Sequence, residues 1–178
     1  MKKKISGIVV ECILGDIATQ NDITAVVNAA NAQLRIGGGV AGAIHRAAGP
    51  GLEEECRPLA PIKPGEAVIT GAHNLPNRFV IHCLGPVFGV DKPEDVLLAN
   101  CYRNALQLAE NNHIDSLAFP AISTGAFGFP IKEATEIAFR TIKEMLSQLK
   151  NIKHIRFVLH DQSALSIHEQ YLEKIIEK

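Results

Sequence analysis

The sequence lacks an excess of charge of either sign. Its 178 residues carry 18 Lys and Arg against 19 Asp and Glu, which gives a net charge of −1 and a pI near 6.6. Proteins that hold a phosphate polymer draw most of their affinity from clustered Lys and Arg, and this balance offers no broad basic face. We therefore expect no nucleic acid among the partners of this protein.

Long apolar runs are also missing. No stretch approaches the roughly 20 residues that a helix needs to cross a bilayer, so we expect no membrane partner. The basic start Met1–Lys4 is followed by the segment Ile5–Leu14, which Ser6, Gly7 and Glu11 interrupt. This segment has neither the apolar core nor the cleavage site of a signal peptide. We interpret it as a first strand and expect a cytoplasmic location.

Cysteine pairs and metal-ligand spacings are absent as well. The four cysteines are scattered without a C-x-x-C pair, which predicts neither a disulfide framework nor a zinc site. No His/Glu or His/His spacing indicates a metal, and we expect neither a metal nor a cofactor. His45 and His82 each follow an apolar residue in a helix-like or strand-like segment, which favours hydrogen-bonded structural histidines. The run Glu53-Glu54-Glu55 is typical of a solvated face.

The chain does contain alternating strand-like and helix-like segments. With 47% hydrophobic and 21% charged residues, it predicts one domain over residues 1–178, and nothing requires more than a monomer. Short runs rich in Val, Ile and Phe predict six strands: Ile5–Leu14, Thr24–Ala29, Ala67–Gly71, Phe79–Leu84, Ser116–Ile122 and His154–His160. Helical spacing predicts helices at Val40–Ala48, Leu97–Leu108, Ala134–Leu149 and Ser163–Ile176. The expected fold is α/β: a three-layer α/β/α sandwich with a mixed, largely parallel six-stranded sheet.

Two glycine-rich turns, each between a predicted strand and a predicted helix, are the most informative motifs. The first reads Asn28-Ala29-Ala30-Asn31 and then Gly37-Gly38-Gly39-Val40. The second is Ser123-Thr124-Gly125-Ala126-Phe127 within residues 120–130. A helix start offers unpaired N–H groups and a positive dipole end, and glycine lets the backbone approach a ligand closely. Two such starts in one domain predict a ligand with two phosphates, held from both sides.

Six segments in this order and spacing resemble the macrodomain family. They are Gly15-Asp16-Ile17, residues 27–31, Gly37–Val40, residues 43–50, residues 81–86 and Phe119–Pro130. The likeness extends from about Glu11 to Leu172. It implies a macrodomain fold that binds ADP-ribose in a cleft at the C-terminal ends of the strands, which is also where open α/β sheets generally bind ligands. The implied partner is ADP-ribose or an ADP-ribosylated protein or metabolite.

The resemblance assigns roles at the two ends of such a ligand. Asp16 would accept a hydrogen bond from the adenine amine, and the Ile17 amide would meet a ring nitrogen. From the residues alone, Asp16 as a cap of the following turn stays open. Asn31 would contact the distal ribose, whereas Asn28 would hold the loop shape through backbone hydrogen bonds. The segment after the last strand has no aromatic residue, so His160 is the first candidate to stack on adenine and Leu165 the second.

The diphosphate and the distal ribose would lie between the two turns. The resemblance implies contacts, chiefly through backbone N–H groups, from Gly37, Gly38, Gly39 and Val40 on one side and from Ser123, Thr124, Gly125, Ala126 and Phe127 on the other. Phe127 would pack against the distal ribose, and a buried core phenylalanine is the alternative. Each turn taken alone is equally consistent with an ordinary turn.

One position separates this chain from the family members that it resembles most. Macrodomains of the MacroD type, which remove ADP-ribose from acidic side chains and deacetylate O-acetyl-ADP-ribose, carry Gly-Gly-Gly-Val-Asp-Gly, but here Ala41 replaces the acid. Losing a general base typically costs about 10²–10⁴-fold in rate. The phosphate of the substrate can serve as base instead, and viral macrodomains with Gly-Gly-Gly-Val-Ala-Gly include active hydrolases.

The resulting hypothesis is a metal-independent hydrolase of ADP-ribosyl esters on acidic side chains, of O-acetyl-ADP-ribose, or of both. Asn31 would orient the ribose and a water, Gly39 would help to fix the ligand, and Phe127 would hold the ribose in a strained pose. Three alternatives stay open. They are a non-catalytic reader of ADP-ribosylated proteins, a phosphatase of ADP-ribose 1''-phosphate, and a docking module for RNA or poly-ADP-ribose.

Overall fold

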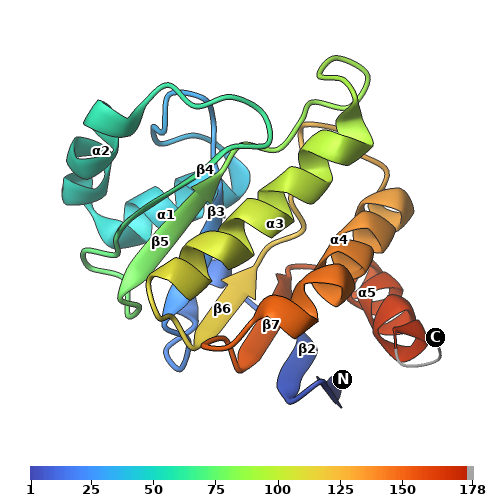
Figure 1. The fold of residues 1–178 in the computed structure, drawn as a ribbon. Helices are drawn as coiled ribbons and strands as arrows, with labels where there is room; N and C mark the ends of the chain where they lie inside the picture. Colours follow the sequence, from blue (N-terminus) through green and yellow to red (C-terminus); the bar gives the residue numbers. More distant parts are fainter. Residues whose placement is uncertain (176–178) are drawn as a thin grey trace.

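The computed structural model describes residues 1–175 as one sheet with helices on both faces (Figure 1). The strands are β1 Lys2–Ile5, β2 Ile8–Leu14, β3 Ala25–Ala29, β4 Ala67–Gly71, β5 Phe79–Cys83, β6 Ser116–Phe119 and β7 His154–Leu159. The α-helices are α1 Gly39–Ala48, α2 Pro50–Cys56, α3 Glu94–Asn111, α4 Ile131–Met145 and α5 Gln162–Lys174. Short 3₁₀ turns occur at η1 Ile17–Thr19, η2 Arg57–Leu59 and η3 Leu146–Gln148.

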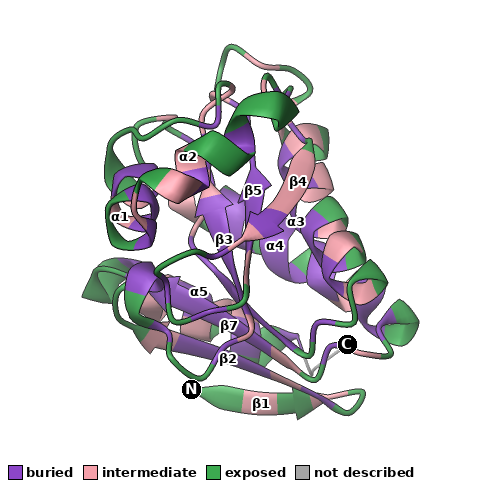
Figure 2. Cartoon of the chain, turned by 90° about the vertical axis from the view of Figure 1, so that its left-hand side faces the viewer, coloured by how far each residue is buried: buried purple, intermediate pink, exposed green. Residues whose placement is uncertain are grey.

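The sheet is mixed, with a parallel centre and antiparallel edges. Its strand order is β1-β2-β7-β6-β3-β5-β4. The strands β2, β7, β6, β3 and β5 pair in parallel, whereas β1 joins β2 and β4 joins β5 antiparallel. The parallel strands are covered on both faces, which explains why their sequences are nearly continuous apolar runs. Figure 2 shows this buried centre and the more exposed edge strand β1.

Two hydrophobic cores lie on the two faces of the sheet. The first contains the buried faces of α3, α4 and α5 together with Val10, Phe119 and Phe157 of the sheet. The second contains the buried faces of α1 and α2 together with Val26 and Val80. Figure 1 shows α3 and α4 side by side in front of the sheet, with α1 and α2 beyond it. The expected three-layer sandwich is confirmed.

The structure differs from the sequence-based expectation in three segments. The predicted strand Ile5–Leu14 is part of a hairpin, because Ser6 (φ 51°) and Gly7 (φ 81°) form a left-handed two-residue turn of the kind that hairpins favour. The sheet therefore has seven strands in place of six. Helix α2, which begins at Pro50, was not predicted. The predicted strand Ser116–Ile122 stops at Phe119, and Ile176, the predicted end of the last helix, lies outside the described residues.

The sheet opens between β3 and β6 at the carboxyl ends of these strands. They pair only at Ala25 with Leu117 and at Val26 with Ala118, whereas β3 pairs with β5 along its whole length. From here the chain leaves β3 toward α1 on one face and leaves β6 toward α4 on the other. Neighbouring strands whose outgoing connections run to opposite faces create a crevice at the edge of the sheet, the usual ligand position in such folds.

Candidate functional site

The loops that follow the five parallel strands all emerge at one edge of the sheet. The strand order therefore arranges the predicted site residues along this edge. In that order they are Asp16 and Ile17 after β2, His160 after β7, Ser123–Phe127 after β6, and Asn31 with Gly37–Val40 after β3. Residues that are far apart in the sequence are thus brought into one row.

The first glycine turn presents a row of free backbone donors. Within the described part of the chain, the N–H groups of residues 37 to 41 donate no hydrogen bond. Gly39 begins α1 with φ 53°, a conformation that favours glycine, and a Cβ on Gly38 or Gly39 would meet no atom within 4 Å. The N-terminal end of α1, which carries the positive end of the helix dipole, therefore faces open space.

Asn31 is held by its own loop. Its Nδ2 donates to the Arg35 carbonyl at 2.8 Å, and its Oδ1 accepts from the Arg35 N–H at 3.0 Å. A Cβ on Gly37 would lie 3.2 Å from Asn31 Nδ2 and 3.8 Å from the Ala41 Cβ. Asn31, Gly37 and Ala41 thus form one corner, where the acid of the MacroD type would stand beside the asparagine. No local pattern in the sequence predicts the bonds between Asn31 and Arg35.

The second glycine turn offers a matching set of donors. Among residues 1–175, the N–H groups of Gly125, Ala126 and Phe127 have no acceptor. Bonds from Phe129 N–H to the Ser123 carbonyl at 2.9 Å and from Gly128 N–H to the Gly125 carbonyl at 3.0 Å hold the turn in shape. The exposed Gly125 would accept a Cβ without meeting any atom within 4 Å. This backbone is also open to a ligand.

Ser123 faces inward, away from the open side of its turn. It has φ 67°, it is 5% exposed, and its Oγ has no hydrogen-bond partner within the described chain. A Cβ on Gly85 would collide with Ser123 Oγ, so the glycine makes room for this side chain. Thr124 is likewise occupied, because its Oγ1 donates to the Ala121 carbonyl at 2.8 Å. The second turn therefore offers its backbone more than its hydroxyl groups.

The two turns rest on a shared core. Val40 of the first turn and Phe127 of the second are both half-buried and pack against the second core, in which Ile17 is also buried. Phe127 therefore packs partly on the core and remains partly exposed. Both roles that the sequence left open, a core phenylalanine and a contact to the ribose, are compatible with this position. This shared support fixes the two rows of amides relative to each other.

At the β2 end of the edge, Asp16 caps a turn and keeps one oxygen free. Its Oδ1 accepts from the Ala18 N–H at 2.9 Å, so the capping role holds, while Oδ2 has no partner within residues 1–175. The Ile17 N–H, at the start of η1, also donates to no described group. A bond from Gly15 N–H to the Leu159 carbonyl at 2.9 Å brings this loop beside His160. The His160 side chain is 91% exposed, whereas Leu165 packs on the first core.

A buried histidine pair stands behind the first turn. Asn28 Nδ2 donates to His82 Nδ1 at 3.1 Å, and His82 Nε2 lies 3.0 Å from Thr70 Oγ1, which itself donates to the Gly71 carbonyl. His82 is therefore neutral, with its proton on Nε2. The prediction that Asn28 uses backbone hydrogen bonds was wrong, because its side chain bonds to a histidine that the parallel register places opposite it.

Burial sets the charge state of both histidines. Burial, and then the neighbouring His45, lower the pKa of His82 to about 3, and burial lowers the pKa of His45. The centroids of the two imidazole rings lie 6.5 Å apart. The prediction of a hydrogen-bonded structural histidine is confirmed for His82. It was wrong for His45, whose buried Nε2 has no hydrogen-bond partner within the described chain. Neither ring is poised for acid–base chemistry near neutral pH.

Sequence reasoning missed two close contacts that shape the crevice. A Cβ on Gly42 would lie 2.4 Å from the Gly37 carbonyl oxygen, so only glycine fits at this helical position. The Phe88 N–H donates to the Phe127 carbonyl at 2.9 Å, which ties the loop after β5 to the second turn. The signal for Gly42 was present in the motif, whereas nothing in the sequence pairs residues 88 and 127.

The described residues show no metal centre and no membrane-spanning helix. Over residues 1–175, no group of three or more His, Cys, Asp or Glu side chains is placed to hold a metal ion. Within the same range, no helix has the length and apolar character needed to cross a bilayer. The polar groups that the crevice offers to a ligand are its free backbone N–H groups and the free oxygen of Asp16.

Comparison with known families and proteins gives matches over nearly the whole chain. The Macro domain family model matches residues 27–138. A protein of Klebsiella pneumoniae named O-acetyl-ADP-ribose deacetylase is 47% identical over 167 residues, covering 91% of this chain and 95% of the relative. A Macro domain-containing protein of Chlorobaculum tepidum is 46% identical over 166 residues, covering 93% of this chain and 96% of the relative.

Solved structures agree with these matches. The Oceanobacillus iheyensis macrodomain with ADP superimposes with a TM-score of 0.94 at 40% identity, covering 99% of this chain and 96% of that one. A Trypanosoma brucei macrodomain in complex with ADP-ribose gives a TM-score of 0.84 at 34% identity, covering 92% of this chain and 68% of that one.

Proposed function

This chain belongs to the macrodomain family, and we propose that it binds ADP-ribose in the crevice and hydrolyses acyl esters of its distal ribose. O-acetyl-ADP-ribose is the proposed small substrate, and ADP-ribosyl esters of acidic side chains are the proposed protein-linked substrates. The names of the Klebsiella relative and of the ADP- and ADP-ribose-bound structures support this assignment.

The observation that carries the proposal is the pair of free amide rows at the opening between β3 and β6. Residues 37–41 and 125–127 offer backbone donors that have no acceptor within the described chain. Helix α1 begins at Gly39, inside the first row, and α4 begins at Ile131, a few residues after the second row. Helix starts of this kind favour anions. Two rows in one crevice suit the two phosphates of a pyrophosphate.

The strand order also fits the length of the ligand. Adjacent strands lie about 4.8 Å apart, so the edge from β2 to β3 covers about 14 Å. Asp16 and the Ile17 amide stand at one end, the second glycine turn in the middle, and Asn31 with Ala41 at the other end. We assign adenine to Asp16 and the distal ribose to the corner at Asn31.

Ester hydrolysis in this crevice requires a water and an acceptor for its proton. The water attacks the acyl carbon, the bond between that carbon and the ribose oxygen breaks, and the products are ADP-ribose and the carboxylic acid. Ala41 offers no carboxylate for the proton of the water, so a phosphate oxygen of the bound substrate is the proposed base. Asn31 orients the ribose, and Phe127 limits its position.

Ala41 specifically favours a second function, that of a reader which binds ADP-ribosylated proteins and releases them unchanged. The substitution Ala41→Asp separates the two functions, because the new carboxylate would stand beside Asn31 and Gly37. If the natural protein is a slow hydrolase, Ala41→Asp raises kcat by about 10²–10⁴-fold, the usual contribution of a general base. For a pure reader, turnover stays at zero in both proteins.

Two measurements test the main proposal. Isothermal titration calorimetry with ADP-ribose should give saturable heat. Inosine diphosphate ribose should bind more weakly, because an oxygen replaces the adenine amine from which Asp16 would accept a hydrogen bond. Acetate release from O-acetyl-ADP-ribose should then exceed the buffer rate at micromolar protein. Absence of heat with ADP-ribose would overturn the binding assignment. Binding without acetate release would favour the non-catalytic reader function over hydrolysis.

A further inference from the structure

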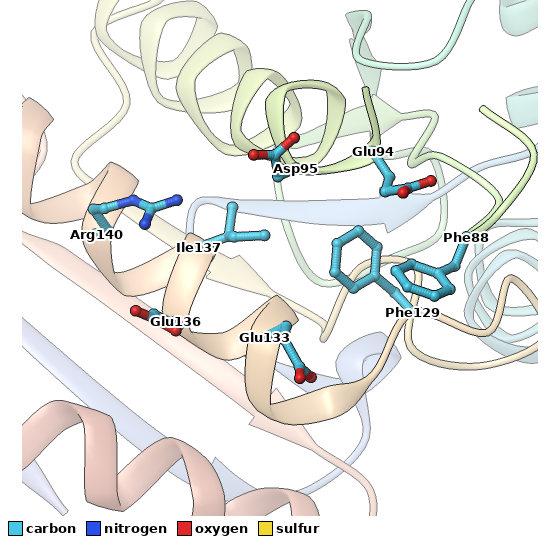
Figure 3. Close-up of a pocket in the computed structure, with 8 residues that line it drawn as sticks. All are labelled: Phe88, Glu94, Asp95, Phe129, Glu133, Glu136, Ile137 and Arg140. Carbon is cyan, nitrogen blue, oxygen red and sulfur yellow. The ribbon is translucent and has the colours of Figure 1, made fainter. Parts of the chain in front are cut away.

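A hollow of about 290 Å³ lies between α3 and α4, beside the second glycine turn (Figure 3). Its apolar floor consists of Phe88, Phe129 and Ile137. The two phenylalanine rings have centroids 5.0 Å apart at an interplanar angle of 59°. Phe129 and Ile137 are buried, whereas Phe88 is 42% exposed. The hollow thus holds an aromatic face that is open to solvent.

Four carboxylates and one guanidinium line the hollow. Glu94 and Asp95 come from the first turn of α3, and Glu133 and Glu136 come from α4, with Arg140 as the single cation (Figure 3). Glu94 accepts from the Gly89 N–H at 3.1 Å. None of these side chains forms an ion pair with a described residue. Four carboxylates against one guanidinium leave an unbalanced negative rim over an apolar floor.

Two further exposed apolar side chains lie close in sequence to residues that line the hollow. Val90 is 72% exposed and Val96 is 49% exposed, and with Phe88 they make up three of the seven exposed large hydrophobic residues of the described chain. All three lie in the short segment from 88 to 96. Clustered exposed apolar surface with a polar rim is typical of a protein interaction site.

We propose that this hollow binds an arginine side chain from the basic segment of a protein that carries ADP-ribose. A guanidinium stacks on an aromatic face and is attracted by carboxylates, and Phe88 together with the negatively charged rim provides this combination. The exposed valines would contact apolar residues next to that arginine. Charge complementarity thus identifies a basic rather than an acidic segment.

The position of the hollow connects it to the crevice. The Phe88 N–H donates to the Phe127 carbonyl, so the loop that carries Phe88 is bonded to the second glycine turn. A protein whose arginine occupies the hollow would hold its modified residue near the distal ribose. This inference rests on the proposed function and extends it from small esters to a class of protein substrate.

The test uses two peptides that carry ADP-ribose on the same glutamate, one with flanking arginines and one with citrulline at those positions. Binding of each labelled peptide is followed by fluorescence anisotropy. The natural protein should bind the arginine peptide at least about tenfold more tightly. In the double variant Glu133→Gln and Glu136→Gln this preference should disappear, while the turnover or binding of O-acetyl-ADP-ribose stays unchanged.

Matched controls keep the result specific. The double variant Glu54→Gln and Glu173→Gln removes the same charge from exposed positions outside the hollow and should keep the preference. Equal affinity for both peptides in the natural protein would overturn the inference, and so would a preference that survives in the Glu133→Gln, Glu136→Gln variant. A dimer in light scattering that Phe88→Ala dissociates would assign the surface to a second copy and also overturn it.

Failure of the proposed function gives a different signature. If O-acetyl-ADP-ribose neither binds nor turns over, the unmodified arginine and citrulline peptides are compared by NMR shifts of the Ile137 methyl group. A shift confined to the arginine peptide supports an arginine site independent of ADP-ribose. Identical spectra with both peptides would reject the arginine site itself.

Discussion

The crevice and the polar cluster around Arg156 differ in whether their hydrogen-bond donors have acceptors. In the crevice, eight backbone N–H groups at residues 37–41 and 125–127 lack acceptors within the described chain. Arg156, on β7, instead donates to Glu11 at 2.7 Å, to Gln20 at 2.9 Å, and to both oxygens of Asp22 at 2.8 and 2.7 Å. One region leaves donors open, and the other satisfies them.

The Arg156 cluster also fixes the charge of its carboxylates. Burial alone would raise the pKa of Glu11, but hydrogen bonds from Arg156 and His154 outweigh burial and hold that pKa below its usual value. The hydrogen bond from Arg156 lowers the pKa of Asp22 to about 2. The cluster joins β2, β7 and the segment before β3, so it stabilises the sheet that carries the crevice. The region with open donors is the proposed binding site, and the region with satisfied donors contributes to stability.

The largest effect should come from Arg156→Ala. Removing the guanidinium leaves the Glu11 carboxylate, 7% exposed, without its main partner, which typically costs about 3–5 kcal/mol of unfolding free energy. Urea unfolding measures this loss. Arg103→Ala is the control, because its pair with Glu144 is exposed on both sides and should contribute less than about 1 kcal/mol. Equal effects would contradict the contrast between the two regions.

Gly125→Val should produce the reverse result. The added side chain enters open space beside the free amides, so the melting temperature should hardly change. It would also occupy the position that we propose for the diphosphate, and ADP-ribose affinity should fall about a hundredfold, equivalent to about 2.7 kcal/mol. Calorimetry and thermal unfolding are run together. Ala47→Val, on the exposed side of α1, is the control and should alter neither.

Acid should separate the two regions by pH window. Burial lowers the folded-state pKa of His82 to about 3 and also lowers that of His45. As pH falls below about 6.5, the unfolded chain binds protons that the folded chain does not. Stability should therefore fall by up to about 1.4 kcal/mol per pH unit for each such histidine.

The Arg156 cluster should respond only at lower pH. The carboxylates of Glu11 and Asp22 have lowered pKa values, so the stability they contribute is present above the unfolded pKa near 4 and is lost as pH falls toward 2. Urea titrations at steps from pH 7.5 to 5 measure the histidine part. His82→Gln should flatten that slope, and an unchanged slope would contradict the assignment.

Asp16→Asn should give the smallest effect. Asn Oδ1 can still accept from the Ala18 N–H, so the cap and the fold remain. The other end of the side chain changes from an acceptor to a donor, which should lower ADP-ribose affinity about tenfold and improve that of inosine diphosphate ribose. Calorimetry with both ligands decides, and unchanged affinities would remove Asp16 from the adenine site.

Sequence reasoning succeeded where local chemistry governs structure. Apolar runs and helical spacing located six of the strand regions, and glycine-rich turns at their ends located the edge with free donors. It failed where distant segments decide. The bonds from Asn31 to Arg35, the Phe88 contact with Phe127, and the pairing of Asn28 with His82 leave no local pattern. The hairpin at Ser6 and Gly7 was visible in the sequence as an interruption but was not read as a turn.

The sequence by itself determined that strands alternate with helices, that two glycine turns follow strands, and that no charge excess or cysteine pattern competes with that reading. These properties are local, because they depend on neighbouring residues and on periodicity. The tertiary structure alone decided which loops face each other: β3 and β6 splay apart after two paired residues, and one shared core supports Val40 and Phe127. Such contacts depend on strand order and packing across long stretches of chain, which no single segment encodes.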